Sequence, residues 1–192
     1  MIEFIIPTYN RPNQLLTVIG SILSQTNSNW KIHVVADAIY PGYENVKNFF
    51  LLNENIKFSE LSGPHNDWGH TPRNHGLEQI AKNSKAVVFT GADNYYLPTF
   101  AEELFYPIAT DKKIVATYCN LLHNKKSWNE LDAKLEFTKI DCGCFMIITE
   151  IAKEFKYGTR VSWEDWVFIE KVIKKYGSDN ILKIPRMLYV HN

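Results

Sequence analysis

The sequence predicts an α/β protein, a single compact domain with one mostly parallel sheet flanked by helices. Short apolar runs alternate with segments whose apolar residues recur at helical spacing, which is typical of strand–helix–strand units. Crossovers of this kind are right-handed and leave their strands parallel in one sheet. The length of 192 residues favours one domain with a sizeable core.

The elements of the first half follow this alternation. "EFIIP" predicts a buried strand that ends at Pro7, and residues 11–25 follow with helical spacing. "KIHVVA" and "NIKFSEL" predict the second and third strands. "HTPRNHGLEQIAKN" predicts a helix with Thr71 as its N-cap and Pro72 at its first position, and "KAVVFT" predicts a fourth strand.

The second half is less regular. "LPTFAEELFYPI" resumes helical spacing, and "KIVATY" and "CFMIIT" predict two more strands. "SWEDWVFIEKVIKKYG" is the clearest helix, with Ser162 as its cap and Gly177 after its end. "ILKIPRMLYVHN" predicts a late pair of strands.

Composition narrows the partners and the location. The formal net charge is +0, so the chain lacks the electrostatic footprint of a nucleic-acid-binding protein. The start, "MIEFIIPTYNRP", predicts neither a signal peptide nor a membrane span, because it has no basic residues before its short apolar run. The three cysteines (Cys119, Cys142 and Cys144) fit buried thiols in a reducing compartment, so we expect a cytoplasmic protein.

Polar residues follow three of the predicted parallel strands, where α/β sheets bind ligands. Thr8 to Asn10 follow the first strand, Asp37 the second and Asp93 the fourth. Each group also fits ordinary capping or turn chemistry. For Asp93, in "TGADNYYLP", one carboxylate is sufficient for a divalent ion on a diphosphate, because phosphate oxygens and waters complete the shell.

Two charged groups in predicted first helical turns are further candidates. The positive charge of Arg73 is unfavourable at a helix N-terminus, and an anionic ligand bound there would explain its presence. Its neighbours His65, His70 and His75 are five residues apart, which does not favour a zinc site.

The pair Glu164 and Asp165 fits an N-terminal capping pattern after Ser162. It equally fits a general base whose pKa is raised between the aromatic walls of Trp163 and Trp166. From the residues alone, both readings stay open.

Taken in order, these pieces resemble the family 2 glycosyltransferases of the GT-A fold, a Rossmann-like nucleotide-binding fold. The opening "FIIPTYNRP" through "HVVADA" is similar to that family's first strand–helix–strand unit. "PRNHG" is similar to its ARNxG helix start, "FTGADNYYLP" stands at its DxD position, and "GCFMI" is similar to a strand before the acceptor site. "WEDWVF" matches its ED motif, and "YVHN" resembles a C-terminal segment whose histidine joins the metal.

The resemblance implies a role for each matched residue. Asp165 would be the catalytic base, with Glu164 orienting the acceptor, and Asp37 would meet the uracil or the ribose. Asp93 and His191 would bind Mn²⁺ or Mg²⁺. The implied nucleotide-binding set is Pro7, Thr8, Tyr9, Asn10, Arg11, Asp37, Arg73 and Asp93, and the sugar or acceptor candidates are Trp68, Tyr95, Trp163 and Trp166.

At three positions this sequence lacks an acidic residue that the family pattern has. Ala36 replaces the first acid of the pair after the second strand, Gly91 replaces the first Asp of DxD, and Asn94 replaces a common third acid. We therefore expect weaker metal binding than a full acidic set would give.

The overall expectation is an inverting glycosyltransferase. It would take a nucleotide-diphosphate sugar, UDP-linked, and a glycan, lipid-linked or protein acceptor. Residues 1–95 would form the nucleotide-binding half and residues 96–192 the acceptor-binding half. One alternative is a nucleotide-sugar- or glycan-binding module without turnover. Another is a nucleotidyltransferase, although the chain has no Gly-rich phosphate loop with a lysine.

Overall fold

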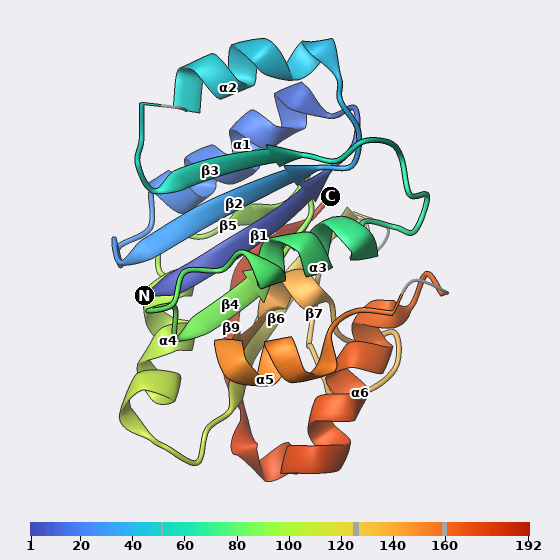
Figure 1. The fold of residues 1–192 in the computed structure, drawn as a ribbon. Coiled ribbons are helices and arrows are strands. Elements are labelled where there is room, and N and C mark those ends of the chain that lie inside the picture. Colours follow the sequence, from blue (N-terminus) through green and yellow to red (C-terminus); the bar gives the residue numbers. More distant parts are fainter. Residues whose placement is uncertain (51, 125–126, 159–160) are drawn as a thin grey trace.

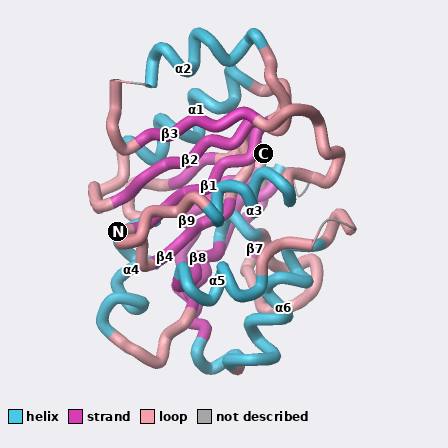
Figure 2. Tube along the Cα trace, viewed as in Figure 1, coloured by secondary structure: helices cyan, strands magenta, loops and turns pink. Residues whose placement is uncertain are grey.

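The computed structural model describes residues 1–50, 52–124, 127–158 and 161–192, and its strands form one sheet (Figure 1). The order across the main path is β3-β2-β1-β4-β8-β6-β9-β5. Mostly parallel strands fill one side of the sheet, and antiparallel pairs join the other side to it. Figure 2 shows this sheet running through the molecule between helices.

The parallel side consists of β1 (Ile2–Thr8), β2 (Trp30–Ala36), β3 (Ile56–Glu60) and β4 (Ala86–Phe89). Every residue of β1 is buried, which its apolar sequence requires at the centre of a parallel sheet. The carboxyl ends of these four strands therefore lie along one edge, as expected from the sequence.

The other side consists of β5 (Tyr95–Tyr96), β6 (Ala116–His123), β8 (Phe145–Ile148) and β9 (Ile181–His191). β8 runs antiparallel to both β4 and β6, whereas β9 runs parallel to β6. A short strand, β7 (Asn129–Leu131), pairs with β6.

Helices cover both faces of the sheet. α3 (His70–Glu78) packs on β1 and β2, and α5 (Thr149–Phe155) lies beside α3 and α6 (Glu164–Tyr176), in front of the sheet in Figure 1. α1 (Pro12–Leu23) contacts β5 and α2 (Glu44–Phe50), and α4 (Phe100–Thr110) packs on β6 and β9. The three cysteines are free and buried, as predicted.

Three local expectations were wrong or incomplete. α2 and α5 were not predicted, because both are short and lack a long apolar stripe. The predicted late strand pair is one strand, β9, whose register against β6 skips Pro185 and Arg186. A bulge at that point accommodates a proline that has no N–H to donate.

The predicted helix caps were also wrong. α3 begins at His70 with Gly69 as its N-cap, so Thr71 lies inside the first turn. α6 begins at Glu164, and among the described residues no side chain caps it, so Ser162 does not act as the cap.

Candidate active site

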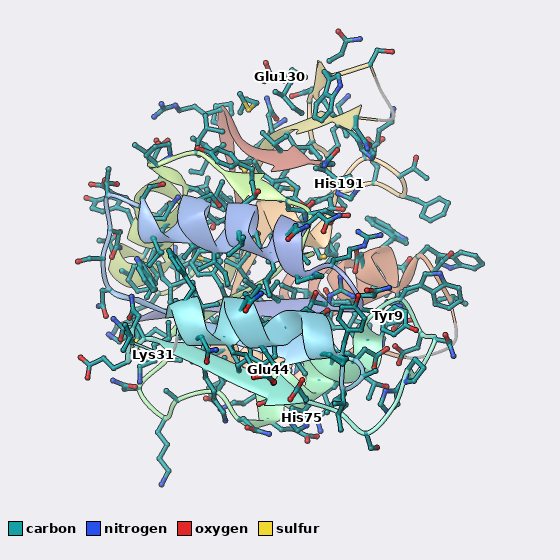
Figure 3. All side chains as sticks on the ribbon, turned by 90° about the horizontal axis from the view of Figure 1, so that it is seen from above. Tyr9, Lys31, Glu44, His75, Glu130 and His191 are labelled. Carbon is teal, nitrogen blue, oxygen red and sulfur yellow. The ribbon has the colours of Figure 1, made fainter. Side chains whose placement is uncertain are left out.

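A cavity of about 380 Å³ opens at the carboxyl ends of the parallel strands. Figure 3 shows Tyr9 and His191 on one side of the molecule and Lys31, at the start of β2, on the other. Ten predicted site residues line this cavity: Pro7, Thr8, Tyr9, Arg11, Asp37, Trp68, Arg73, Asp93, Asp165 and His191. The described lining does not include Asn10, Tyr95, Trp163, Glu164 or Trp166.

The loop after β1 is held by contacts with the hydroxyl of a buried tyrosine. Tyr43 places its hydroxyl 2.9 Å from Thr8 Oγ1 and accepts a hydrogen bond from the Arg11 backbone N–H at 3.3 Å. Burial raises the pKa of Tyr43. Asn10 adopts a left-handed backbone (φ 50°), which turns the chain from the strand into α1. The family resemblance implied that Asn10 contacts the nucleotide; in the structure Asn10 is an exposed residue of the bend between β1 and α1.

Asp37, at the end of β2, is held by the connector between β3 and α3. Its Oδ2 accepts from the His65 backbone N–H at 3.1 Å, and its Oδ1 lies 2.5 Å from His65 Nδ1. Both oxygens of this buried carboxylate therefore have a partner from one residue. A carboxylate oxygen accepts more than one hydrogen bond, so Asp37 retains capacity for a ligand.

The start of α3 is capped by Asp67 rather than by Thr71. The Asp67 carboxylate accepts from the backbone N–H groups of His70 and Thr71 and from the Thr71 hydroxyl. Left-handed backbone at Trp68 and Gly69 (φ 58° and 84°) makes this approach possible. The same turn leaves the Trp68 side chain 59% exposed at the cavity.

Arg73 extends from α3 beneath the cavity and is buried. It donates to the Trp68 carbonyl at 2.9 Å and lies over the Tyr157 ring at 5.3 Å. Its Nη2 is 3.8 Å from Cys142 Sγ, and within the described part of the chain its Nε has no hydrogen-bond partner. Burial alone would lower the pKa of Arg73, but the nearby Cys142, Asp165, Tyr157 and Asp141 outweigh burial and raise it. The site therefore holds a positive charge close to where an anionic ligand would bind.

Asp165 lies in the first turn of α6 and faces the same cavity. Its Oδ1 is shielded from solvent and has no hydrogen-bond partner in the described ranges 1–50, 52–124, 127–158 and 161–192. Burial, the largest cause, and the nearby Asp141 carboxylate raise the pKa of Asp165, whereas Arg73 opposes the shift. A carboxylate in this state is a stronger base than a solvated one.

Glu164, next to it, points elsewhere. It is buried and accepts a 2.7 Å hydrogen bond from the Gly158 backbone N–H. A Cβ at position 158 would lie 2.6 Å from the Glu164 carboxylate, so the two segments meet without room for a side chain. The two predicted aromatic walls differ as well: Trp163 is 52% exposed, and Trp166 packs against Phe137.

Asp93, after β4, forms an ion pair with Arg11 at the cavity. A Cβ at Gly91 would come within 3.0 Å of the Asp93 carboxylate, so the glycine lets that carboxylate fold back over the turn. Asn94 is buried and donates to Thr90 at 3.1 Å, which makes it part of the turn. Tyr95, half exposed, lies in β5 beyond the described lining.

The sequence analysis missed Asp141, a second acid in the cavity. It precedes β8, and because β8 runs antiparallel, its amino end lies at the same edge as the carboxyl ends of the parallel strands. Burial would raise the pKa of Asp141, but hydrogen bonds from His191, the Gly143 N–H and Tyr189 outweigh burial and lower it. In the sequence, Asp141 is an acid that precedes a predicted strand. It can be assigned to the cavity only if the direction of that strand in the sheet is known.

The donors present fit a divalent ion only in part. In the described ranges, no three His, Cys, Asp or Glu side chains are arranged to hold a metal. Asp93 and His191 nevertheless line one cavity, and His191 Nδ1 lies 3.1 Å from a carboxylate oxygen of Asp141. Metal-binding histidines commonly direct the other ring nitrogen to such a group. Two protein ligands fit an ion whose remaining ligands are diphosphate oxygens and waters.

Comparison with known families decides the identity of this fold. The sequence pattern described as glycosyl transferase family 2 matches residues 3–170. The chain belongs to glycosyl transferase family 2. The expected resemblance is thereby confirmed, and a comparison with curated proteins finds no match.

Solved structures agree with this family 2 fold. S. aureus TarS 1-349 in complex with UDP-GlcNAc is 17% identical over 98% of this chain and 57% of its own, with a TM-score of 0.80. A further crystal structure of S. aureus TarS 1-349 is 17% identical over 100% of this chain and 60% of its own, with a TM-score of 0.77. The mannosyltransferase PcManGT from Pyrobaculum calidifontis, in complex with GDP-Man and Mn²⁺, is 18% identical over 99% and 56%, with a TM-score of 0.73.

At these identities the likeness establishes the GT-A fold. This family 2 chain spans less than two thirds of the length of each of these three solved structures. Of the helices in the described ranges, none combines the length and the apolar character needed to cross a membrane.

Proposed function

We propose that this chain is an inverting glycosyltransferase that moves a sugar from a UDP-linked donor to an acceptor hydroxyl with the help of Mn²⁺ or Mg²⁺. The observation that carries the proposal is the shielded Oδ1 of Asp165 in a cavity that also contains Asp93 and Arg73. Membership of family 2 supports glycosyl transfer, and the relatives solved with UDP-GlcNAc and with GDP-Man and Mn²⁺ support the donor class.

In this proposal Asp165 is the general base. It takes the proton from the acceptor hydroxyl while that oxygen attacks the anomeric carbon, and the bond from that carbon to the diphosphate oxygen breaks. A single displacement of this kind inverts the configuration. Its raised pKa suits proton abstraction near neutral pH.

The nucleotide would lie against the ends of β1, β2 and β4. Asp37 would accept from the base or the ribose, and Thr8, Tyr9 and Arg11 would line the phosphate path. Asp93 and His191 would hold the divalent ion, whose charge offsets that of the departing diphosphate. Residues 1–95 would thus supply most of the donor site and residues 96–192 the base and the acceptor side.

The acceptor side is defined less closely. Trp68 at the cavity and the exposed Trp163 are candidates to stack on a sugar face. Glu164 would act indirectly, through its bond to Gly158, rather than by touching the acceptor. A glycan, a lipid-linked sugar or a protein hydroxyl would each satisfy the proposed base.

The test is to incubate the protein with a panel of nucleotide sugars, Mn²⁺ and varied acceptors and to measure the nucleotide released. Release of UDP that increases with acceptor supports the proposal. Binding of UDP without release, across the panel, would favour a binding module instead. Pyrophosphate as the product would indicate a nucleotidyltransferase.

A further inference from the structure

The Asp141 carboxylate joins two separate parts of the chain, its own turn and β9. Its Oδ1 accepts from the Gly143 backbone N–H at 2.7 Å and from the Tyr189 hydroxyl at 2.9 Å. Its Oδ2 lies 3.1 Å from His191 Nδ1. The side chain is 19% exposed, so these contacts are largely shielded from water.

The surrounding backbone is built to allow this approach. A Cβ at position 143 would lie 2.2 Å from the Tyr189 hydroxyl oxygen, so the turn between Asp141 and β8 needs glycine there. Tyr189 and His191 are two residues apart on β9 and therefore face the same side. The His191 ring also packs on that of His123, its partner on β6, with centroids 4.4 Å apart.

We propose that Asp141 is a positioning residue that fixes the orientation and the tautomer of His191 as a metal ligand. A carboxylate has no proton to donate, so the Nδ1 that faces it must carry the hydrogen. The neutral ring then has its lone pair on Nε2, and Nε2 is the ligating atom. This inference rests on the proposed function, because it takes His191 as a ligand of the divalent ion.

The two oxygens of Asp141 separate this role from a structural one. Capping of the turn Cys142–Cys144 uses Oδ1 and the Gly143 N–H. Oδ2 is directed at His191 and contributes nothing to that cap. Two strands, β6 and β9, hold the ring against it, which is the arrangement that a precise ligand requires.

The substitution Asp141→Asn tests the tautomer directly. The Gly143 N–H can only donate, so the amide oxygen must take the Oδ1 place and the NH₂ group must face His191. His191 Nδ1 must then accept, and its proton moves to Nε2, where it blocks metal binding. We expect the Mn²⁺ affinity of the UDP-bound protein to fall on the order of 10- to 100-fold, measured from the free Mn²⁺ signal by electron paramagnetic resonance.

Tyr189→Phe is the control: it removes the donor to Oδ1 and the longer, 3.4 Å contact of the hydroxyl with His191 Nδ1, but it keeps the contact between Asp141 Oδ2 and His191. It should change the Mn²⁺ affinity far less than Asp141→Asn. In a His191→Ala background, Asp141→Asn should have no further effect on Mn²⁺ binding, since interacting residues are not additive. Equal losses in both backgrounds would mean that Asp141 is structural and would overturn the inference.

A measurement on the unmodified protein covers the case in which Asp141→Asn does not fold. Long-range ¹H–¹⁵N spectra should show His191 protonated on Nδ1, and an Nε2-protonated ring overturns the inference. If the wild-type protein binds UDP but takes up no Mn²⁺, the metal-assisted function and this inference both fail. If it takes up Mn²⁺ and Asp141→Asn binds the ion equally well, only the inference fails.

Discussion

Two carboxylates that line the cavity, Asp37 and Asp165, differ in their hydrogen bonding. Asp37, at the end of β2, has both oxygens bonded to His65. Asp165, in the first turn of α6, has an oxygen shielded from water and without a hydrogen-bond partner in the described part of the chain. A carboxylate whose two oxygens already accept hydrogen bonds is held in place to bind a ligand. A carboxylate with an oxygen that accepts no hydrogen bond is suited to taking a proton. The difference supports the proposal that Asp37 takes part in donor recognition and Asp165 in the chemistry.

The largest expected effect is on kcat and comes from substitution of Asp165. Asp165→Asn keeps the shape of the side chain and removes the base, so kcat should fall on the order of 100- to 10,000-fold. The Kd for UDP should stay near the wild-type value, because Asp165 is proposed to contact the acceptor. Steady-state kinetics with calorimetric UDP binding checks both halves. Wild-type turnover in this variant would remove Asp165 from the mechanism.

The matching change at Asp37 should have the opposite profile. Asp37→Asn removes the charge that accepts from the nucleotide, and loss of a charged hydrogen bond corresponds to roughly a 10- to 100-fold weaker Kd for UDP. At saturating donor, kcat should change little. If Asp37→Asn lowers kcat as much as Asp165→Asn does, the division of roles between the two carboxylates is wrong.

The stability of the fold around β2, the strand that ends at Asp37, should depend on pH through His33. This residue of β2 is fully buried, and burial, with Lys57 and His75 nearby, lowers its pKa to about 4. The unfolded chain then binds a proton that the folded chain does not, so stability is complete above pH 6.5 and is lost as the pH falls toward 4.

Between pH 6.5 and 5 the free energy of unfolding should fall by about 1.5 kcal/mol on this account. Denaturant titrations of wild type and His33→Gln check this, since the variant should lose much of that slope. His75→Gln removes only a smaller cause of the same pKa shift, so it should retain most of the slope. A wild-type stability that is flat over this range would contradict the assignment.

The smallest expected effect concerns His65, which positions Asp37. His65→Ala removes the ring contact and keeps the backbone N–H, so one hydrogen bond to the carboxylate remains. The Kd for UDP should rise roughly two- to tenfold, the usual value of one hydrogen bond. Titration of UDP into the two proteins measures it, and an unchanged Kd would show that Asp37 needs no help from the connector.

Strand ends were the part of the site that the sequence revealed best. Asp37 and Asp93 follow apolar runs in a parallel half, where strand order alone places both at one edge. Asp141 could not be found in this way, because it lies before its strand and the direction of β8 depends on the tertiary pairing with β4 and β6.

Helix starts were predicted poorly for a local reason. Thr71-Pro72 has the sequence pattern of an N-cap. In the structure, however, the carboxylate of Asp67, two residues before Gly69, caps the helix, and it does so because the intervening backbone is left-handed. The residue types alone do not predict that backbone conformation. Ser162 fails similarly, since α6 begins at Glu164 and the carboxylate of that residue bonds to Gly158. Both cases depend on where a neighbouring loop passes, which local sequence does not specify.

The placement of His191 on β9 has a kinetic consequence. Its strand pairs in parallel with β6, a long way back in the sequence, and pairings of that kind form slowly because a large loop must close first. β1, which ends at Thr8, and β2, which leads to Asp37, are joined by nearer contacts, but β4, which leads to Asp93, pairs with β1 across an even longer stretch, Ile2 with Ala86. Asp93 and His191 are thus both brought to the cavity by long-range pairings, so we expect the complete cavity to form late in folding rather than from local contacts.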